Sequence, residues 1–336
     1  MNSIQTETVS YDTLFSTTSR VRRDRITDNT GNSQPTLDEL LSAGKVEVEN
    51  GGESIIETLE YAQQAMEWMS GSQAVSTEDV ETITEAIYPW RWAVAPVRIN
   101  LTDELRARAN AMDAMDFAEA KIRAARQGLR TGVNTSLWGA QSGKSMLGFQ
   151  DGIKDSPSAG SLGGIDQSIS ANSWFRNTAY TTSHTFTTKT VTDTYDGWVA
   201  IGTNYEAASD KNEEITHIAM GSTLYGKALS TLESGTYLRF NGGGRRALDA
   251  GGQGVDDGPM FRRAKLYKDR AVPASKIYGW NIDSVKLRIG KGANFSKTPF
   301  ADTSATGVLG KVCFYIVMIQ LTFKQPRRSF VETAVS

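Results

Sequence analysis

Residues 51–63 read GGESIIETLEYAQ, and residues 86–99 read AIYPWRWAVAPVRI. In both stretches polar and apolar residues alternate, which is the pattern of a β-strand. The residues between them are polar, most clearly from Ser70 to Asp79. The sequence therefore predicts two long strands joined by a loop of roughly 20 residues, far beyond the ~2–5 residues of a common hairpin loop.

Residues 102–132 have the spacing of an amphipathic helix. Thr102 is a suitable N-cap, and Gly132 can close the helix. At ~1.5 Å per residue the helix would span roughly 45 Å, which suits a structural spine. Gly128 lies inside it, and glycine costs roughly 1 kcal/mol relative to alanine there, so we expect a close contact at this position. The apolar stripe comprises Leu105, Ala109, Met112, Met115, Ala118, Ile122, Ala125 and Leu129.

The rest of the chain mixes strands and helices without βαβ regularity, which favours an α+β fold. Residues 1–40 are polar and without period, as in a mobile N-terminal arm, and they carry Arg20, Arg22, Arg23 and Arg25. The segment 242–258 holds seven glycines and must be a loop. Further strands are expected at 178–194, 276–280, 285–289 and 312–321, and a strand followed by a helix at 215–232.

Composition excludes several classes of protein. The chain has 336 residues, of which 39% are hydrophobic, and a net charge of −2. The basic excess of a tight nucleic-acid coat is therefore missing. Cys313 is the only cysteine, so no intrachain disulfide can form. The apolar run 312–321 is too short for a membrane span of ~20 residues, and the chain does not start like a secretory signal. We expect a soluble protein of a reducing cytoplasm.

Two segments resemble ligand-binding motifs and depart from them. GAQSGKS, Gly139–Ser145, has three residues instead of four between the first glycine and Gly-Lys, and a predicted helix precedes it instead of a strand. GGQGVD, Gly251–Asp256, matches the start of a calcium-binding β-roll repeat, but that site requires stacked copies. We expect neither a nucleotide nor a calcium site.

The residues most suited to chemistry do not form a pattern. His184 and His217 are the only histidines, and with one cysteine they are too few for a zinc cluster. Neither histidine accompanies a nucleophile motif, and Cys313 lies in an apolar run where a buried inert thiol is the default. The sequence thus predicts no catalytic residue, no cofactor-binding residue and no metal ligand.

Trp90 and Trp92 flank Arg91, which permits two interpretations. They could form a stacking platform for nucleic acid, because bases stack on aromatic side chains beside positive charge. Alternatively, both tryptophans pack beneath another element of the fold, and we favour this interpretation.

Several segments, in order, resemble the major capsid proteins of tailed double-stranded DNA bacteriophages, which have the Hong Kong 97-like fold. The resemblance covers roughly residues 45–180 and 275–325 and is weaker in between. It is carried by GGESIIETLEYAQ from Gly51, AIYPWRWAVAPVRI from Ala86, SLWG at 136–139, GFQDGI at 148–153, GSLGGIDQS and SWFRN within 160–177, and WNIDSVKLRIGKGANFSKTPF at 280–300.

The resemblance implies an α+β capsid fold in which the chain is divided into five segments with different roles. Residues 1–44 would be the N-terminal arm, 45–100 an extended hairpin lying across a neighbouring subunit, and 101–149 the spine helix and peripheral domain. Residues 150–270 would build the axial domain, and 271–336 would supply the returning strands and the C-terminus.

The implied function is that of a major capsid protein, which assembles in the host cytoplasm and resides in the virion. Its partners would be copies of itself in pentamers and hexamers, separate scaffolding, portal and decoration proteins, and packaged double-stranded DNA on the inner face, with no membrane. No enzyme activity or cofactor is implied. A phage tail or adhesion protein is the alternative, although such proteins usually contain repeats and none is found here.

The hairpin yields a first prediction. Its strands carry apolar residues on both faces, and an isolated two-stranded hairpin is marginal in water. We therefore expect the hairpin to become ordered only against a neighbouring chain. Deleting Ser70–Asp79 should leave the protein soluble and folded by circular dichroism, while shells fail to form. Normal shells from the deletion variant would mean that the segment makes no contact between subunits.

Overall fold

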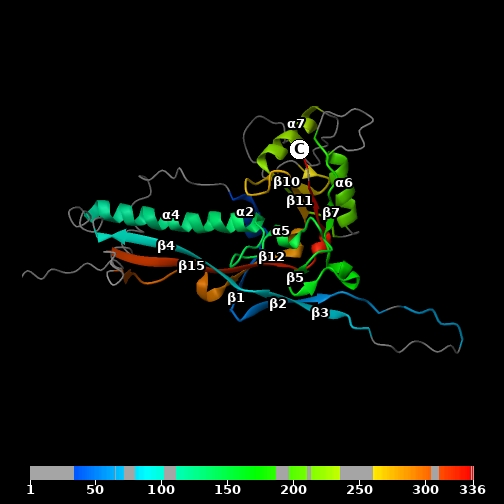
Figure 1. The fold of residues 1–336 in the computed structure, drawn as a ribbon, viewed down its shortest axis with the longest axis horizontal. Helices are drawn as coiled ribbons and strands as arrows, with labels where there is room; N and C mark the ends of the chain where they lie inside the picture. The colour runs from blue at the N-terminus through cyan, green and yellow to red at the C-terminus, as the bar shows by residue number, and fades with distance from the viewer. Residues whose placement is uncertain are drawn as a thin grey trace, which may run out of the picture.

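The computed structural model describes residues 34–64, 66–71, 80–101, 111–186, 197–209, 213–234, 260–303, 310–333 and 335. Most of the expected N-terminal arm, the first residues of the predicted helix from Thr102 and the glycine-rich segment 242–258 lie outside these ranges. The described residues build two six-stranded sheets, a long helix, a projecting two-stranded hairpin and a small two-stranded sheet of β5 (Ser161–Leu162) and β6 (Ile165–Asp166) (Figure 1).

The first sheet is elongated and follows the long helix. Its main path is β1 (Val46–Glu49), β12 (Val285–Gly290), β15 (Gly310–Phe323) and β13 (Ser296–Lys297), and both β4 (Arg91–Asn100) and β14 (Ala301–Asp302) also pair with β15. The antiparallel pairing of β15 with β4 runs from Gly310–Asn100 to Ile319–Arg91. These strands confirm the predictions for 285–289 and 312–321. The strand predicted at 86–99 is divided, because residues 86–89 end β3 (Ile83–Pro89) in the hairpin and residues 91–99 belong to β4 in this sheet.

Helix α4 (Ala111–Trp138) lies along β4 and β15 (Figure 1). The predicted end at Gly132 is wrong, because the helix continues for six more residues. Val133, Leu137 and Trp138 in this last part are buried, and their burial outweighs the helix penalty of one glycine, roughly 1 kcal/mol. The close contact expected at Gly128 is also absent from the described chain: a Cβ added there would meet nothing within 4 Å.

The second sheet stands beside the first and carries its own helices. Its strand order is β7 (Thr178–Tyr180), β16 (Ser329–Glu332), β11 (Ile277–Trp280), β8 (His217–Met220), β10 (Ala264–Lys268) and β9 (Met260–Phe261). One face packs against α6 (Gly197–Ala208) and α7 (Ser222–Ser234) through a separate apolar cluster that includes Trp198, Ile218 and Leu224. The strand at 276–280 and the strand and helix within 215–232 are confirmed.

Residues 35–42, assigned by composition mostly to an irregular arm, form helix α2 (Pro35–Ser42). Two helical turns are too short to show a period, but Pro35 at the first position is a start signal. The hydroxyl of Thr36 donates to Asp269 Oδ2 at 2.7 Å, and the backbone N–H of Leu37 donates to Asn134 Oδ1 at 3.3 Å. Tertiary hydrogen bonds and burial therefore hold this helix in place.

The hairpin predicted from the opening stretch is present. Strands β2 (Ser54–Glu60) and β3 (Ile83–Pro89) pair antiparallel, from Ser54–Pro89 to Glu60–Ile83. One face belongs to the main core of the same chain, with Ile55, Leu59 and Tyr88 buried, and the Tyr88 hydroxyl donates to the backbone oxygen of Phe323 at 2.8 Å. The expectation that the whole hairpin needs a neighbour for order is therefore wrong for its base.

An aromatic cluster joins the two sheets. Phe149, which opens the short helix α5 (Phe149–Gly152), stacks on Trp138 with ring centroids 4.6 Å apart and contacts Trp280 at 4.9 Å. Phe323 of β15 meets Phe149 edge to face at 6.0 Å. A Cβ at Gly152 would lie 2.2 Å from the Phe323 ring, so this position requires glycine.

The second sheet holds a buried polar pair. Nε2 of His184 lies 3.0 Å from Glu332 Oε2, and Asn204 donates to Glu332 Oε1 at 3.0 Å. His184 Nδ1 lies 3.0 Å from the carbonyl oxygen of Thr182 and must carry a proton, because that oxygen only accepts. The contact between histidine and carboxyl therefore holds one proton, whichever atom carries it. Burial raises the pKa of Glu332, and the hydrogen bonds from His184 and Asn204 only partly oppose this.

This pair predicts a specific pH dependence of stability. Because the pKa of Glu332 is raised on folding, the stability that this group contributes is lost as pH rises toward its folded value. Above about pH 6.5 an unfolded chain holds a neutral histidine and an ionised glutamate, one proton fewer than the folded pair. The free energy of unfolding should then fall with pH by up to about 1.4 kcal/mol per unit.

The control for this prediction is Glu332→Gln, whose amide can donate to Nε2 of a neutral His184 and accept from Asn204. Urea unfolding at several pH values should show a shallower fall for this variant than for the parent. Equal pH profiles would mean that the pair does not carry the extra proton.

Candidate functional site

The outer face of the hairpin is apolar and exposed. Since side chains alternate along a strand, Ile56, Ile83 and Ile87 point away from the core that Ile55 and Tyr88 enter, and Ile83 is 57% exposed. The segment beyond the strands projects from the body (Figure 1) and carries Met66, Trp68 and Met69, with Trp68 88% exposed. Large contiguous apolar surfaces of this kind mark interaction sites.

A second apolar strip lies on the first sheet, on the face opposite α4. It comprises Trp92 and Val94 of β4 and Phe314 of β15, and Trp92 is 60% exposed. The packing favoured for both tryptophans is thus confirmed for Trp90, which is buried, and wrong for Trp92. Trp90 lies between β3 and β4, whereas Trp92 lies within β4 and points outward from the sheet.

An ion-pair network fixes the base of the hairpin to the first sheet. The buried carboxylate of Glu57 in β2 accepts from Arg288 Nη2 at 2.5 Å and from Thr322 Oγ1 at 3.0 Å, and Lys324 Nζ lies 3.2 Å from it. Arg288 also pairs with Glu47 and, at 2.7 Å, with Glu49 of β1. Burial opposes ionisation of Glu57, but Arg288 and Lys324 outweigh it and hold the pKa of this carboxyl below its ordinary value.

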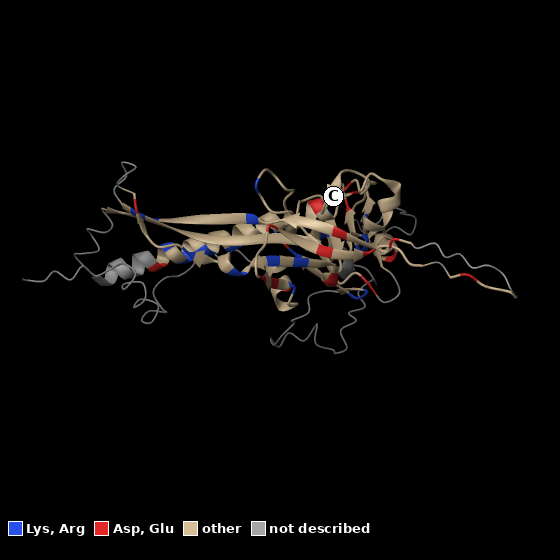
Figure 2. Ribbon diagram, turned by 90° about the horizontal axis from the view of Figure 1, so that it is seen from below, with Lys and Arg blue, Asp and Glu red and all other residues tan. Residues whose placement is uncertain are grey.

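Charge is otherwise sparse on the projecting hairpin segment. The charged residues in its described part, 61–64, 66–71 and 80–82, are Glu67 and Glu81, and both are acidic. The ribbon of this segment in Figure 2 is mostly tan, with red at acidic positions. Lysine and arginine are instead found on α4 and on the first sheet (Figure 2). The projecting segment is therefore apolar and acidic, and the body is mixed.

The residues considered for chemistry do not converge. His184 is buried with Glu332, and His217 begins β8, where Nε2 lies 3.5 Å from Glu39 and burial lowers its pKa. Cys313 is buried, as expected. Within the described ranges no group of His, Cys, Asp or Glu side chains is suited to hold a metal ion. Gly251–Asp256 lies outside those ranges.

Gly139–Ser145 forms the turn between α4 and α5, so a helix precedes it, as the sequence predicted. The described part of the chain has no helix that is both long and apolar enough to cross a membrane. The exposed apolar faces of the hairpin and of the first sheet are surfaces suited to contact with other protein chains.

No protein-family model matches the chain, and no curated protein matches it in sequence. Solved capsid structures nevertheless match it almost end to end. The capsid asymmetric unit of cyanophage A-1(L) aligns with a TM-score of 0.65 and 14% identity over 94% of this chain and 96% of that one. The capsid of the native GTA particle aligns with a TM-score of 0.61 and 11% identity, covering 94% and 95%.

The capsid of Myoviridae phage XM1 is a further match, with a TM-score of 0.57 and 9% identity over 95% of this chain and 97% of that one. These likenesses define the fold: the chain has the fold of tailed-phage capsid proteins. The α+β, Hong Kong 97-like fold expected from the sequence is thereby confirmed.

The Glu57 network yields a prediction for the hairpin base. Arg288→Met leaves a buried carboxylate without its main partner and should reduce the free energy of unfolding by about 3 kcal/mol at pH 7. Lys286→Met on the same strand is the matched control, because Lys286 pairs with the partly exposed Glu47 and should cost less than about 1 kcal/mol.

The difference in the free energy of unfolding between the parent and Arg288→Met should also depend on pH. Since the pKa of Glu57 is lowered on folding, its stabilisation is present above the ordinary glutamate range and is lost as pH falls through the folded value. Urea unfolding of parent and Arg288→Met should therefore converge in acid. A constant difference between them across pH would exclude Glu57 as the cause.

Proposed function

We propose that this chain is the major capsid protein of a tailed double-stranded DNA phage and self-assembles into the icosahedral shell of the virion. The observation that carries the proposal is the fold likeness to capsid subunits over nearly the full length of both chains. The exposed apolar faces of the hairpin and of the first sheet support it, because a shell subunit must cover such surfaces with its neighbours.

The division of labour within the subunit follows the same proposal. Residues 1–44 act as the N-terminal arm, 45–100 as the hairpin that reaches a neighbour, and 101–149 as the spine helix and peripheral domain. Residues 150–270 form the axial domain at fivefold and sixfold axes, and 271–336 return to both sheets. The main core spans both sheets, and the second apolar cluster, between α6, α7 and the second sheet, supports a separate axial unit.

The proposed partners are copies of this chain in pentamers and hexamers, separate scaffolding, portal and decoration proteins, and packaged DNA contacted without sequence specificity on the inner face. The near-zero net charge supports a protein packed side by side in many copies. The role is structural, without an enzyme activity, and assembly takes place in the host cytoplasm.

Electron microscopy of the purified chain tests this function. We expect closed particles, regular or aberrant in size, with fivefold and sixfold clusters of subunits, and sedimentation far faster than a monomer of 36.6 kDa. Fibres would instead support a tail or adhesion protein. A chain that stays monomeric at high concentration, with or without an added scaffolding protein, would contradict the proposal.

A further inference from the structure

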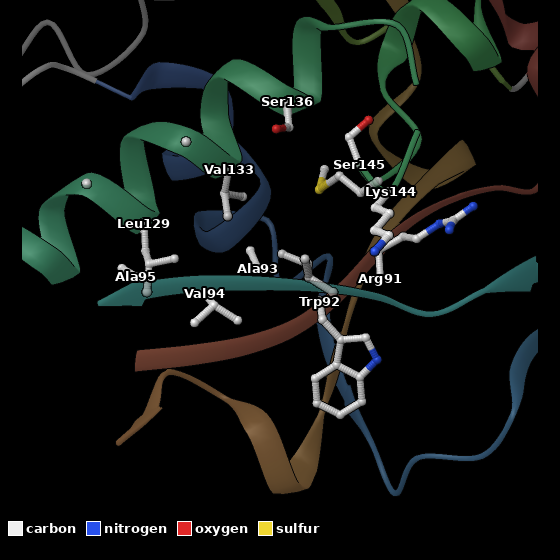
Figure 3. Close-up of a pocket in the computed structure, with 14 residues that line it drawn as sticks. Arg91, Trp92, Ala93, Val94, Ala95, Leu129, Val133, Ser136, Lys144 and Ser145 are labelled. Atoms are coloured by element: carbon white, nitrogen blue, oxygen red, sulfur yellow. The ribbon is translucent and has the colours of Figure 1, made fainter. Parts of the chain in front are cut away.

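A groove with a volume of about 450 Å³ lies between α4 and β4 (Figure 3). Its walls are mainly apolar side chains of both elements, among them Ala93, Leu129 and Val133. Gly128 and Gly132 also line it, and a Cβ added at either glycine would meet nothing within 4 Å, so the helix side of the groove is open. A space of this size falls in the range of pockets that bind small molecules, about 300–1,000 Å³.

One end of the groove is positively charged. Arg91 and Lys144 lie together at that end (Figure 3), and neither has an ion-pair partner among the described residues. The Nε atom of Arg91 is buried and has no hydrogen-bond partner in the part of the chain that the structure describes. Because a buried unpaired donor is costly, this end is suited to an acceptor that a ligand supplies. A carboxylate can accept two parallel hydrogen bonds from a guanidinium.

The turn between α4 and α5, beside the charged end, favours a carboxylate ligand over a phosphate. Phosphate sites use several backbone N–H groups of a turn or of a helix N-terminus. In this turn the N–H groups of Gln141 and Gly148 already donate to Asp151 Oδ2, at 2.8 and 2.9 Å. The N–H group of Ser142 donates to Ser145 Oγ at 2.8 Å. The anionic group of a ligand would therefore be bound by the side chains at this end of the groove.

The rest of the groove is suited to an alkyl chain. The polar side chains of Ser136 and Ser145 lie toward the charged end, whereas Ala95 and Leu129 lie toward the other end (Figure 3). A peptide would bring backbone N–H and C=O groups, which need partners when they are buried, and apolar side chains offer none. An alkyl chain has no polar atoms to satisfy, so it fits these walls better than a peptide does.

We propose that the groove between α4 and β4 binds a medium-chain alkyl carboxylate, with the carboxylate at Arg91 and the alkyl chain along Gly128 and Gly132. The site goes beyond the proposed capsid function and does not depend on it, because all of its residues belong to one chain. The two glycines then have a role in the free subunit, since their missing side chains leave the space that the alkyl chain occupies.

Isothermal titration calorimetry of the unassembled full-length chain tests the class of ligand. Across the series from butanoate to decanoate, Kd should fall roughly tenfold for every two methylene groups added, until the chain reaches the end of the groove. Octanol and octylammonium should each bind about tenfold or more weakly than octanoate, because neither offers a charged acceptor to Arg91. Equal binding of octanoate and octanol, or no binding across the series, would overturn the proposal.

Variants of the lining residues test the site. Arg91→Gln should raise the Kd for octanoate about tenfold or more and remove the preference over octanol. Gly132→Leu and, separately, Gly128→Leu fill the groove and should weaken octanoate binding by a similar factor, while the melting temperature stays at or above that of the parent because leucine favours helix. Arg130→Gln and Thr135→Leu are the matched controls on α4 outside the groove, and both should bind octanoate like the parent.

Photo-cross-linking locates the ligand directly. Octanoate that carries a diazirine near its methyl end should label peptides containing residues 128–133 or 93–95 when it is irradiated with the parent chain. Excess unmodified octanoate should suppress this label. Inorganic phosphate and adenosine triphosphate at the same concentration should leave it unchanged.

The outcomes separate this inference from the proposed function. A label confined to other peptides, or octanoate binding by both leucine variants at the parent's affinity, would mean that the site is wrong. Competition by phosphate would contradict the choice of a carboxylate. Tighter binding of a short peptide that ends in a leucine carboxylate than of octanoate would make the occupant a peptide terminus and overturn the alkyl ligand. None of these results changes the expected particles in electron microscopy, which test the capsid function.

Discussion

The contact on which the rest of the molecule depends is the aromatic cluster around Phe149. The ring of Phe149 lies between Trp138 at the end of α4, Trp280 of β11 and Phe323 of β15, so it touches the long helix and both sheets. Each of these side chains is almost fully buried. Because aromatic rings bury large areas and prefer defined relative orientations, this cluster fixes the direction in which α4 and β15 leave the junction.

The hairpin has one face in the core of its own chain and one face exposed. Its inner face is held by Tyr88 and by the buried Glu57 with Arg288, which fixes the direction of the strands relative to the first sheet. Its outer face exposes Ile56 and Ile87. A rigid base therefore holds the apolar face outward, and rigidity of this kind reduces the entropy lost in any association through that face.

The C-terminal part of α4 is stabilised by burial of its large side chains. Burial of Val133, Leu137 and Trp138 stabilises the helix. It remains helical although Gly128 and Gly132 leave open space beside β4. The cost of the glycines is small compared with the burial of several large side chains, at about 1.5–3 kcal/mol each. The helix can thus keep open space on one side without ending there.

The sequence by itself determined the strong local patterns: the alternation in β2 and β3, the apolar run of β15, the stripe of α4 and the mixed α+β class. The resemblance of short segments such as GFQDGI to a known family predicted the particular fold. In the structure these segments contain buried core residues such as Phe149. Those features depend on neighbouring residues or on a few fixed positions, so one chain suffices to predict them.

Only the tertiary structure decided the rest. Helix α2 is too short to show a period and depends on Asp269 and Asn134, far along the chain. Trp90 and Trp92 look equivalent in the sequence, but the packing of separate elements buries Trp90 in the main core and leaves Trp92 exposed. The open space beside Gly128 and the exposure of Trp68 also depend on how separate elements pack, because contacts between distant residues leave no periodic signal in the sequence.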